Sequence, residues 1–128
     1  MTNSKGYVDY YLSQLSGPEA ENSWHSLVEA GPDALPYLVE AFNSNDDPQI
    51  QVRLIQIICQ YRSKNAVPFL STQLNNQFPE IWKTALDGLV SLGNTEAIEA
   101  LGVAMEHVKG EKREWIEEAI QQIYESQQ

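Results

Sequence analysis

The sequence has little cysteine, little histidine and few basic residues. Cys59 is the single cysteine, so no disulfide can form within the chain, and two histidines are too few for most metal sites. Eight lysines and arginines stand against 18 aspartates and glutamates, which gives a net charge of −10. Surfaces that bind nucleic acid or anionic lipid are basic. We therefore expect neither a nucleic acid nor a membrane among the partners.

Long apolar runs are also missing. The run Ile57-Ile58-Cys59 is far too short to span a membrane, and the polar opening, residues 1–6, lacks the apolar centre of a secretory signal. No Gly-rich loop ends in Gly-Lys-Ser/Thr, so a phosphate-binding loop is not expected. No carboxylate, Cys–His pair or metal-ligand spacing points to catalysis. We expect a cytoplasmic protein with no cofactor, no metal and no catalytic residue.

What the chain does contain is helical periodicity, interrupted by glycine and proline. Apolar residues recur every three or four positions, as in Leu35, Leu38 and Phe42, and strand-like alternation is missing. Asp33, Asp47 and Asn94 can cap helix starts. The pattern predicts an all-α protein with eight helices, at residues 7–16, 18–30, 33–43, 48–62, 65–75, 79–92, 95–107 and 111–125.

The eight predicted helices form four similar pairs. The second helix of each pair has an equivalent closely packed position, spaced at 32, 30 and 31 residues: Ser26, Ile58, Gly88 and Ala119. One helical hairpin per period of about 31 residues is typical of an α-solenoid. We therefore predict a single domain over residues 1–128, with units at about 7–30, 33–62, 65–92 and 95–125.

Three segments carry a family resemblance. Residues 34–38 (Ala-Leu-Pro-Tyr-Leu), 65–70 (Asn-Ala-Val-Pro-Phe-Leu) and 89–98 resemble HEAT repeats, particularly the short bacterial type of the phycobilin lyases. In that family an outer helix precedes an inner helix, and the inner helices line a concave binding surface. The inner helix usually opens with Val-Arg after an Asp, which here is matched by Val52-Arg53 after Asp47. The resemblance implies a fold and leaves the activity unspecified.

The predicted inner helices present a ridge of residues at helical spacing. Protein-binding candidates on this ridge are His25, Glu29, Leu54, Ile57, Tyr61, Asp87, Trp115 and Glu118. Packing between repeats is the competing interpretation for Leu54, Tyr61 and Trp115. We expect Trp24 and Trp82 in the core between repeats, and a buried, structural thiol at Cys59.

These patterns favour a non-catalytic protein–protein interaction module that is a monomer when free. Residues 1–52 carry eight acidic side chains against Lys5 alone, so the partner expected is another protein, and a basic one. A sharper version is a small acidic neutraliser, such as an immunity protein that covers a basic toxin. Acidity that serves only solubility remains an alternative. A second alternative is an enzyme or enzyme subunit of the HEAT-like phycobilin-lyase type.

Overall fold

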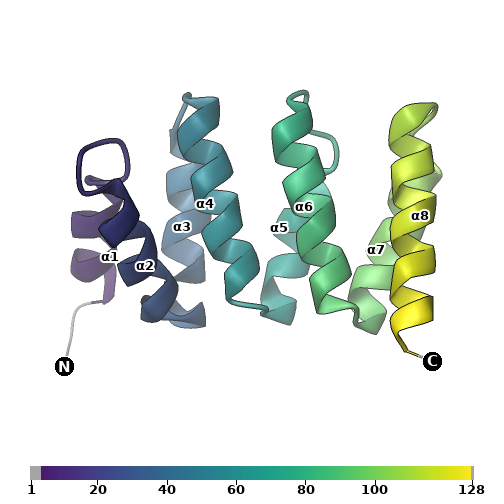
Figure 1. Ribbon diagram of the computed structural model, residues 1–128, viewed down its shortest axis with the longest axis horizontal. Helices are drawn as coiled ribbons and strands as arrows, with labels where there is room; N and C mark the ends of the chain where they lie inside the picture. Colours follow the sequence, from purple (N-terminus) through teal and green to yellow (C-terminus); the bar gives the residue numbers. More distant parts are fainter. Residues whose placement is uncertain (1–3, 128) are drawn as a thin grey trace. The chain divides into compact units, whose positions relative to one another are not determined.

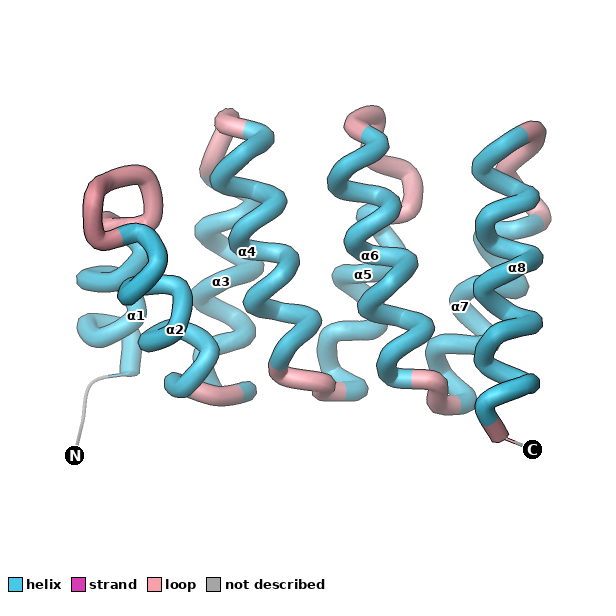
Figure 2. The backbone as a smooth tube through the Cα atoms, in the orientation of Figure 1, coloured by secondary structure: helices cyan, strands magenta, loops and turns pink. Residues whose placement is uncertain are grey.

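The computed structural model describes residues 4–127. Within this range it contains eight α-helices and two short 3₁₀ turns and no strand (Figures 1 and 2), which confirms the all-α prediction. The elements are α1 (Ser4–Leu12), α2 (Ala20–Ala30), the 3₁₀ turn η1 (Pro32–Ala34), α3 (Leu35–Ser44), α4 (Pro48–Gln60), the 3₁₀ turn η2 (Lys64–Ala66), α5 (Val67–Gln73), α6 (Pro79–Leu92), α7 (Thr95–Met105) and α8 (Glu111–Ser126).

The helices group into two compact units, the first ending at Tyr61 and the second beginning at Arg62. In the first unit α1 packs on α2 and α3 on α4, while α1 also lies against α3 and α2 against α4. The second unit repeats this arrangement with α5 to α8, so each unit is two hairpins in two layers (Figure 1). We call the second helix of each hairpin, α2, α4, α6 and α8, an inner helix. The single domain over residues 1–128 stays a prediction.

Helix starts follow the capping pattern of the sequence at two of the three expected positions. The side chain of Asp47 accepts a hydrogen bond from the Gln49 N–H at 2.9 Å, and that of Asn94 accepts one from the Ala97 N–H at 2.8 Å. Asp33 caps no helix, because it lies inside η1, whose N-terminal flanking residue is Gly31. The helices α3 and α5 each start two residues later than predicted, since the 3₁₀ turns η1 and η2 precede them.

The first hairpin differs most from its prediction. The helix α1 ends at Leu12, four residues early, and α2 starts at Ala20. Beyond Leu12 the backbone makes tighter bonds between residues three apart, such as Gln14 N–H to Tyr11 O, and the Ser13 hydroxyl donates to the Tyr10 carbonyl at 2.6 Å. Serine, glycine and proline at 16–18 then continue the turn.

The closely packed repeat position is buried in three of the four hairpins. Ile58 and Ala119 are 0% and 4% exposed, Gly88 is buried, and Ser26 is half-buried. Of the two tryptophans predicted to lie in the core, one is buried and the other is not. Trp82 is buried at 7% exposure, whereas Trp24 is half-buried. The prediction of a buried thiol at Cys59 is wrong: Cys59 is partly exposed, because one further step along α4 rotates it away from the side on which Ile58 is buried.

Basic side chains bind backbone carbonyls more often than carboxylates. In the first unit the Arg53 guanidinium of α4 donates to the Leu15 carbonyl, and in the second the Lys112 ammonium of α8 donates to the Leu74 carbonyl at 2.8 Å. Both bonds span 38 residues, and each ties the second inner helix of its unit to the chain just after the first outer helix. Further such bonds join Arg62 to the Ser91 carbonyl and Arg113 to the Met105 carbonyl.

Ion pairs are correspondingly scarce. Among residues 4–127 the structure has two, Lys5 with Asp9 at 3.4 Å and Arg113 with Glu117 at 3.0 Å, and all four side chains are about half exposed. Most acidic side chains therefore face solvent without a cation of this chain, and the negative charge is not neutralised internally.

Candidate functional site

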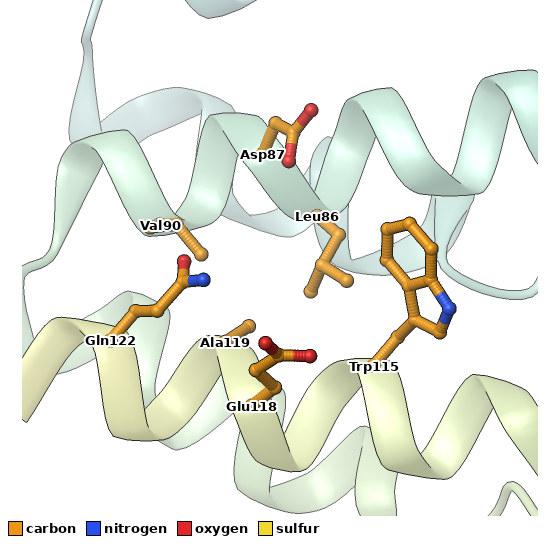
Figure 3. Close-up of a pocket in the computed structure, with 7 residues that line it drawn as sticks. All are labelled: Leu86, Asp87, Val90, Trp115, Glu118, Ala119 and Gln122. Atoms are coloured by element: carbon orange, nitrogen blue, oxygen red, sulfur yellow. The ribbon is translucent and has the colours of Figure 1, made fainter.

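Each unit has a groove between its two inner helices. The α6–α8 groove of the second unit has a volume of about 210 Å³ (Figure 3). It is lined by Leu86, Asp87, Val90, Trp115, Glu118, Ala119 and Gln122. The α2–α4 groove of the first unit is larger, with a volume of about 400 Å³. It is lined by Ala20, Glu21, Trp24, His25, Arg53 and Gln56.

The α6–α8 groove lies between the outward-facing sides of two amphipathic helices. In α8, Ile116, Ala119 and Ile123 are buried at three- and four-residue spacing, so Trp115 and Glu118 face outward beside them. Glu118 and Gln122 point from α8 toward α6, and Trp115 stands at one end of the groove (Figure 3). The opposite wall comes from α6, which supplies two aliphatic side chains and the carboxylate of Asp87.

The residues that line this groove carry negative charge only. Its lining contains two carboxylates and no basic residue. Among residues 4–127, neither Asp87 nor Glu118 makes a side-chain hydrogen bond or an ion pair. Partial burial raises the pKa of Asp87, because removing water disfavours the ionised carboxylate. A positive ligand would relieve that penalty.

Aromatic rings and lysines form a cluster at the Trp115 end of the groove. The rings of Trp82 and Trp115 meet edge to face with centroids 5.8 Å apart. The Lys83 ammonium lies 4.5 Å from the Trp115 ring centroid, and that of Lys112 lies 5.0 Å from the Trp82 centroid. Burial lowers the pKa of Lys112, whose Nζ donates to the Leu74 carbonyl. The Trp115 indole therefore contacts both the Trp82 ring and the Lys83 ammonium.

The α2–α4 groove has a different composition. Trp24 and His25, successive residues of α2, have perpendicular rings with centroids 5.3 Å apart. Arg53 of α4 lies in the same lining, and its guanidinium is held by the Leu15 carbonyl. The lining of this groove therefore includes a cation of its own chain as well as the carboxylate of Glu21.

Five of the eight sequence-predicted site residues are exposed. Asp87, Trp115 and Glu118 come together in the α6–α8 groove, and Trp115 is 38% exposed. His25 lines the α2–α4 groove, and Glu29 is exposed on α2 but lines neither groove. That these residues contact a partner stays a prediction.

The other three are not surface residues. Leu54 is 1% exposed, Ile57 is 0% exposed and Tyr61 is 9% exposed. The prediction that they lie on an exposed ridge is wrong, because α4 is apolar on more than one side. The Tyr61 hydroxyl donates to the Leu27 carbonyl at 2.6 Å, and burial raises the pKa of this phenol far above its usual value. Tyr61 is therefore a structural residue of the first unit.

The aliphatic wall of the α6–α8 groove was missed by the sequence reasoning. Val90 is three residues after Asp87 on α6, so the helical spacing of Asp87 could have found it. Leu86 directly precedes Asp87, and helical spacing from Asp87 does not indicate it. Arg53 and Gln56 were also missed as groove residues. Arg53 was noted only as part of the repeat motif, and nothing in the sequence indicates its reach to the first hairpin.

Two further features are absent from the described part of the chain. Within residues 4–127, no three His, Cys, Asp or Glu side chains lie close enough together to hold a metal ion. None of the helices there has the length and apolarity needed to cross a membrane.

Comparison with known proteins assigns the family. The sequence model of HEAT repeats matches residues 35–121, more than half of the chain, and the match does not distinguish the phycobilin-lyase type. No curated protein matches the chain significantly. The helical hairpins and this match together confirm the predicted fold class, an α-solenoid of HEAT-like hairpins, and the chain belongs to the HEAT-repeat family.

Proposed function

We propose that this chain is a non-catalytic binding module that takes a basic protein partner on its inner helices. HEAT repeats generally mediate protein–protein interaction and are typically non-catalytic. The observation that carries the proposal for this chain is the α6–α8 groove, where an exposed tryptophan and two unpaired carboxylates line one depression. Aromatic anchors next to charges that select the partner are common at protein interfaces.

Charge supports a basic partner in particular. Basic side chains of this chain bind carbonyls and rings, so most of its carboxylates have no cation of their own. Such a surface attracts a positively charged protein from a distance and speeds its association. A small acidic protein that covers a basic toxin, as immunity proteins do, is the specific form of this proposal.

The test starts with purification of the partner from the native cells on the immobilised chain. Association and dissociation rates are then measured for the wild type and for Trp115→Ala at low and high salt. We expect Trp115→Ala to dissociate at least about tenfold faster, as hot-spot anchors do. Tyr124→Ala is the matched control, because Tyr124 lies on the same helix, is 53% exposed and does not line the groove.

The acidic residues of α2 test the electrostatic part separately. Replacing Glu21 and Glu29 by glutamine should slow association mainly at low salt, since such attraction is screened over about 8 Å at physiological ionic strength. A partner that is acidic, or one whose binding ignores both salt and Trp115→Ala, would contradict the proposal.

A further inference from the structure

The size of the α6–α8 groove limits what it can hold. Its volume of about 210 Å³ is below the roughly 300–1,000 Å³ of small-molecule sites. The lining is amphipathic, with Leu86, Val90 and Trp115 supplying apolar surface and Asp87 and Glu118 supplying negative charge. A long side chain with an apolar stem and a positive end matches both parts.

The first unit provides an internal comparison. Its α2–α4 groove has a tryptophan, a glutamate and Arg53 in the lining. The α6–α8 groove has a tryptophan and two carboxylates, and no arginine or lysine lines it. The same type of groove thus has an arginine of the chain in its lining in one unit and no basic residue in its lining in the other.

We propose that the α6–α8 groove binds one arginine side chain of the partner protein. The guanidinium lies between the carboxylates of Asp87 and Glu118, and the methylene stem lies along Leu86, Val90 and Trp115. This inference rests on the proposed function and deepens it, because it names the chemical group that the groove recognises.

Arginine fits this lining better than lysine. A guanidinium carries five N–H donors in one plane, so it can serve two carboxylates and the side-chain oxygen of Gln122 together. It is also more weakly hydrated than an ammonium group and stacks on aromatic surfaces. One side of the Trp115 ring already has the Lys83 ammonium 4.5 Å from its centroid. The carboxylates therefore supply the main attraction, and the indole supplies mostly apolar contact.

The experiment is an NMR titration of the full chain with two blocked tripeptides, Gly-Arg-Gly and Gly-Lys-Gly. The chain has three tryptophans, so three indole N–H signals are expected, and Trp115→Phe identifies the one from the groove. We expect the arginine peptide to shift this signal saturably, with a Kd several-fold lower than that of the lysine peptide.

Two double variants with equal charge loss decide the result. D87N/E118Q keeps the shape of the groove and should weaken the arginine peptide by about tenfold or more. E99Q/E106Q removes two exposed carboxylates of the same unit that lie outside the groove and make no ion pair among residues 4–127, and should leave the Kd within about twofold. Equal binding of both peptides, no saturable shift, or an unchanged Kd in D87N/E118Q would each overturn the inference.

These outcomes are separable from those of the proposed function. A partner protein that binds wild type and D87N/E118Q equally overturns the arginine inference and leaves the protein-binding function standing. A groove that binds the arginine peptide selectively, in a chain whose partner protein proves to be acidic, supports arginine recognition by the groove and overturns the proposal of a basic partner.

Discussion

In the first unit Arg53 lines the groove between the inner helices, whereas the corresponding groove of the second unit is lined by two carboxylates and no base. Both units tie their two hairpins with a cation bound to a carbonyl 38 residues away. In the first unit the cation that does so also lines the groove. In the second unit Lys112 makes the equivalent bond from outside the groove lining. The same arrangement of helices can therefore have a groove with or without a basic residue in its lining. The difference depends on which residue donates the hydrogen bond to the distant carbonyl.

The largest expected effect concerns two tyrosines near the ends of α4 and α8. Tyr61 is 9% exposed and bonded to the Leu27 carbonyl, whereas Tyr124 is 53% exposed. Tyr61→Ala should lower the free energy of unfolding by about 3 kcal/mol or more, since it leaves a cavity and an unpaired carbonyl. Tyr124→Ala should change it by less than about 0.5 kcal/mol. Urea denaturation monitored by circular dichroism measures both, and equal effects would show that the two helix ends are packed alike.

A second comparison uses the repeat position of α2 and α6. Gly88 is buried and Ser26 is half-buried. Gly88→Leu should destabilise the chain by about 1–3 kcal/mol, because the new side chain must displace closely packed neighbours. Ser26→Leu should cost clearly less, because part of its side chain can remain in solvent. Thermal melting of the two variants checks this, and a Gly88→Leu protein that melts within a degree of wild type would refute the repeat alignment.

The two cation–carbonyl bonds can be broken one at a time. Arg53→Met and Lys112→Met keep most of the aliphatic stem and remove the donor, at an expected cost of about 1 kcal/mol each. Native-state hydrogen exchange should locate the effects, with faster exchange in the first unit for Arg53→Met and in the second for Lys112→Met. Faster exchange throughout the chain in either variant would mean that these bonds do not act within their own units.

The smallest expected effect comes from Asp87. Its pKa is raised in the folded chain, so the ionised carboxylate opposes folding slightly at neutral pH. This cost disappears as the pH falls through the raised folded pKa and is gone below the unfolded value of about 3.9. Asp87→Asn should therefore stabilise the chain at pH 7 by less than about 0.5 kcal/mol, and by nothing near pH 3. Glu99→Gln, which removes one exposed charge of the same unit, is the control in denaturation at both pH values. A gain for Asp87→Asn that is equal at both pH values would contradict this explanation.

Helices could be predicted from sequence far more accurately than groove residues. The helix α6 begins and ends at its predicted residues, 79 and 92, because proline and glycine mark its limits locally. The predicted end of α1 failed because Ser13 and its neighbours form a turn, and a hydroxyl bonded to a carbonyl competes with the helix.

The site predictions succeeded or failed according to how polar each inner helix is. In α8 only Ile116, Ala119 and Ile123 are buried, so helical spacing determines the outward side on which Trp115 and Glu118 lie. In α4 the residues at 54, 55, 57 and 58 are all buried. Spacing alone cannot tell which side of such a helix is exposed, since the neighbours that cover it come from distant parts of the chain.

Because its basic side chains bind carbonyls and rings, the chain should tolerate substitution less well at basic positions than at acidic ones. Among residues 4–127, six of the eight basic side chains contact a backbone carbonyl or an aromatic ring: Lys5, Arg53, Arg62, Lys83, Lys112 and Arg113. In a saturation library selected only for folded protein, these positions should therefore lose variants, while most acidic positions accept neutral residues freely. Under selection for folding alone, random substitution would erode the net charge of −10. A lineage that keeps this charge over many generations must be selected for something that the charge does outside the fold.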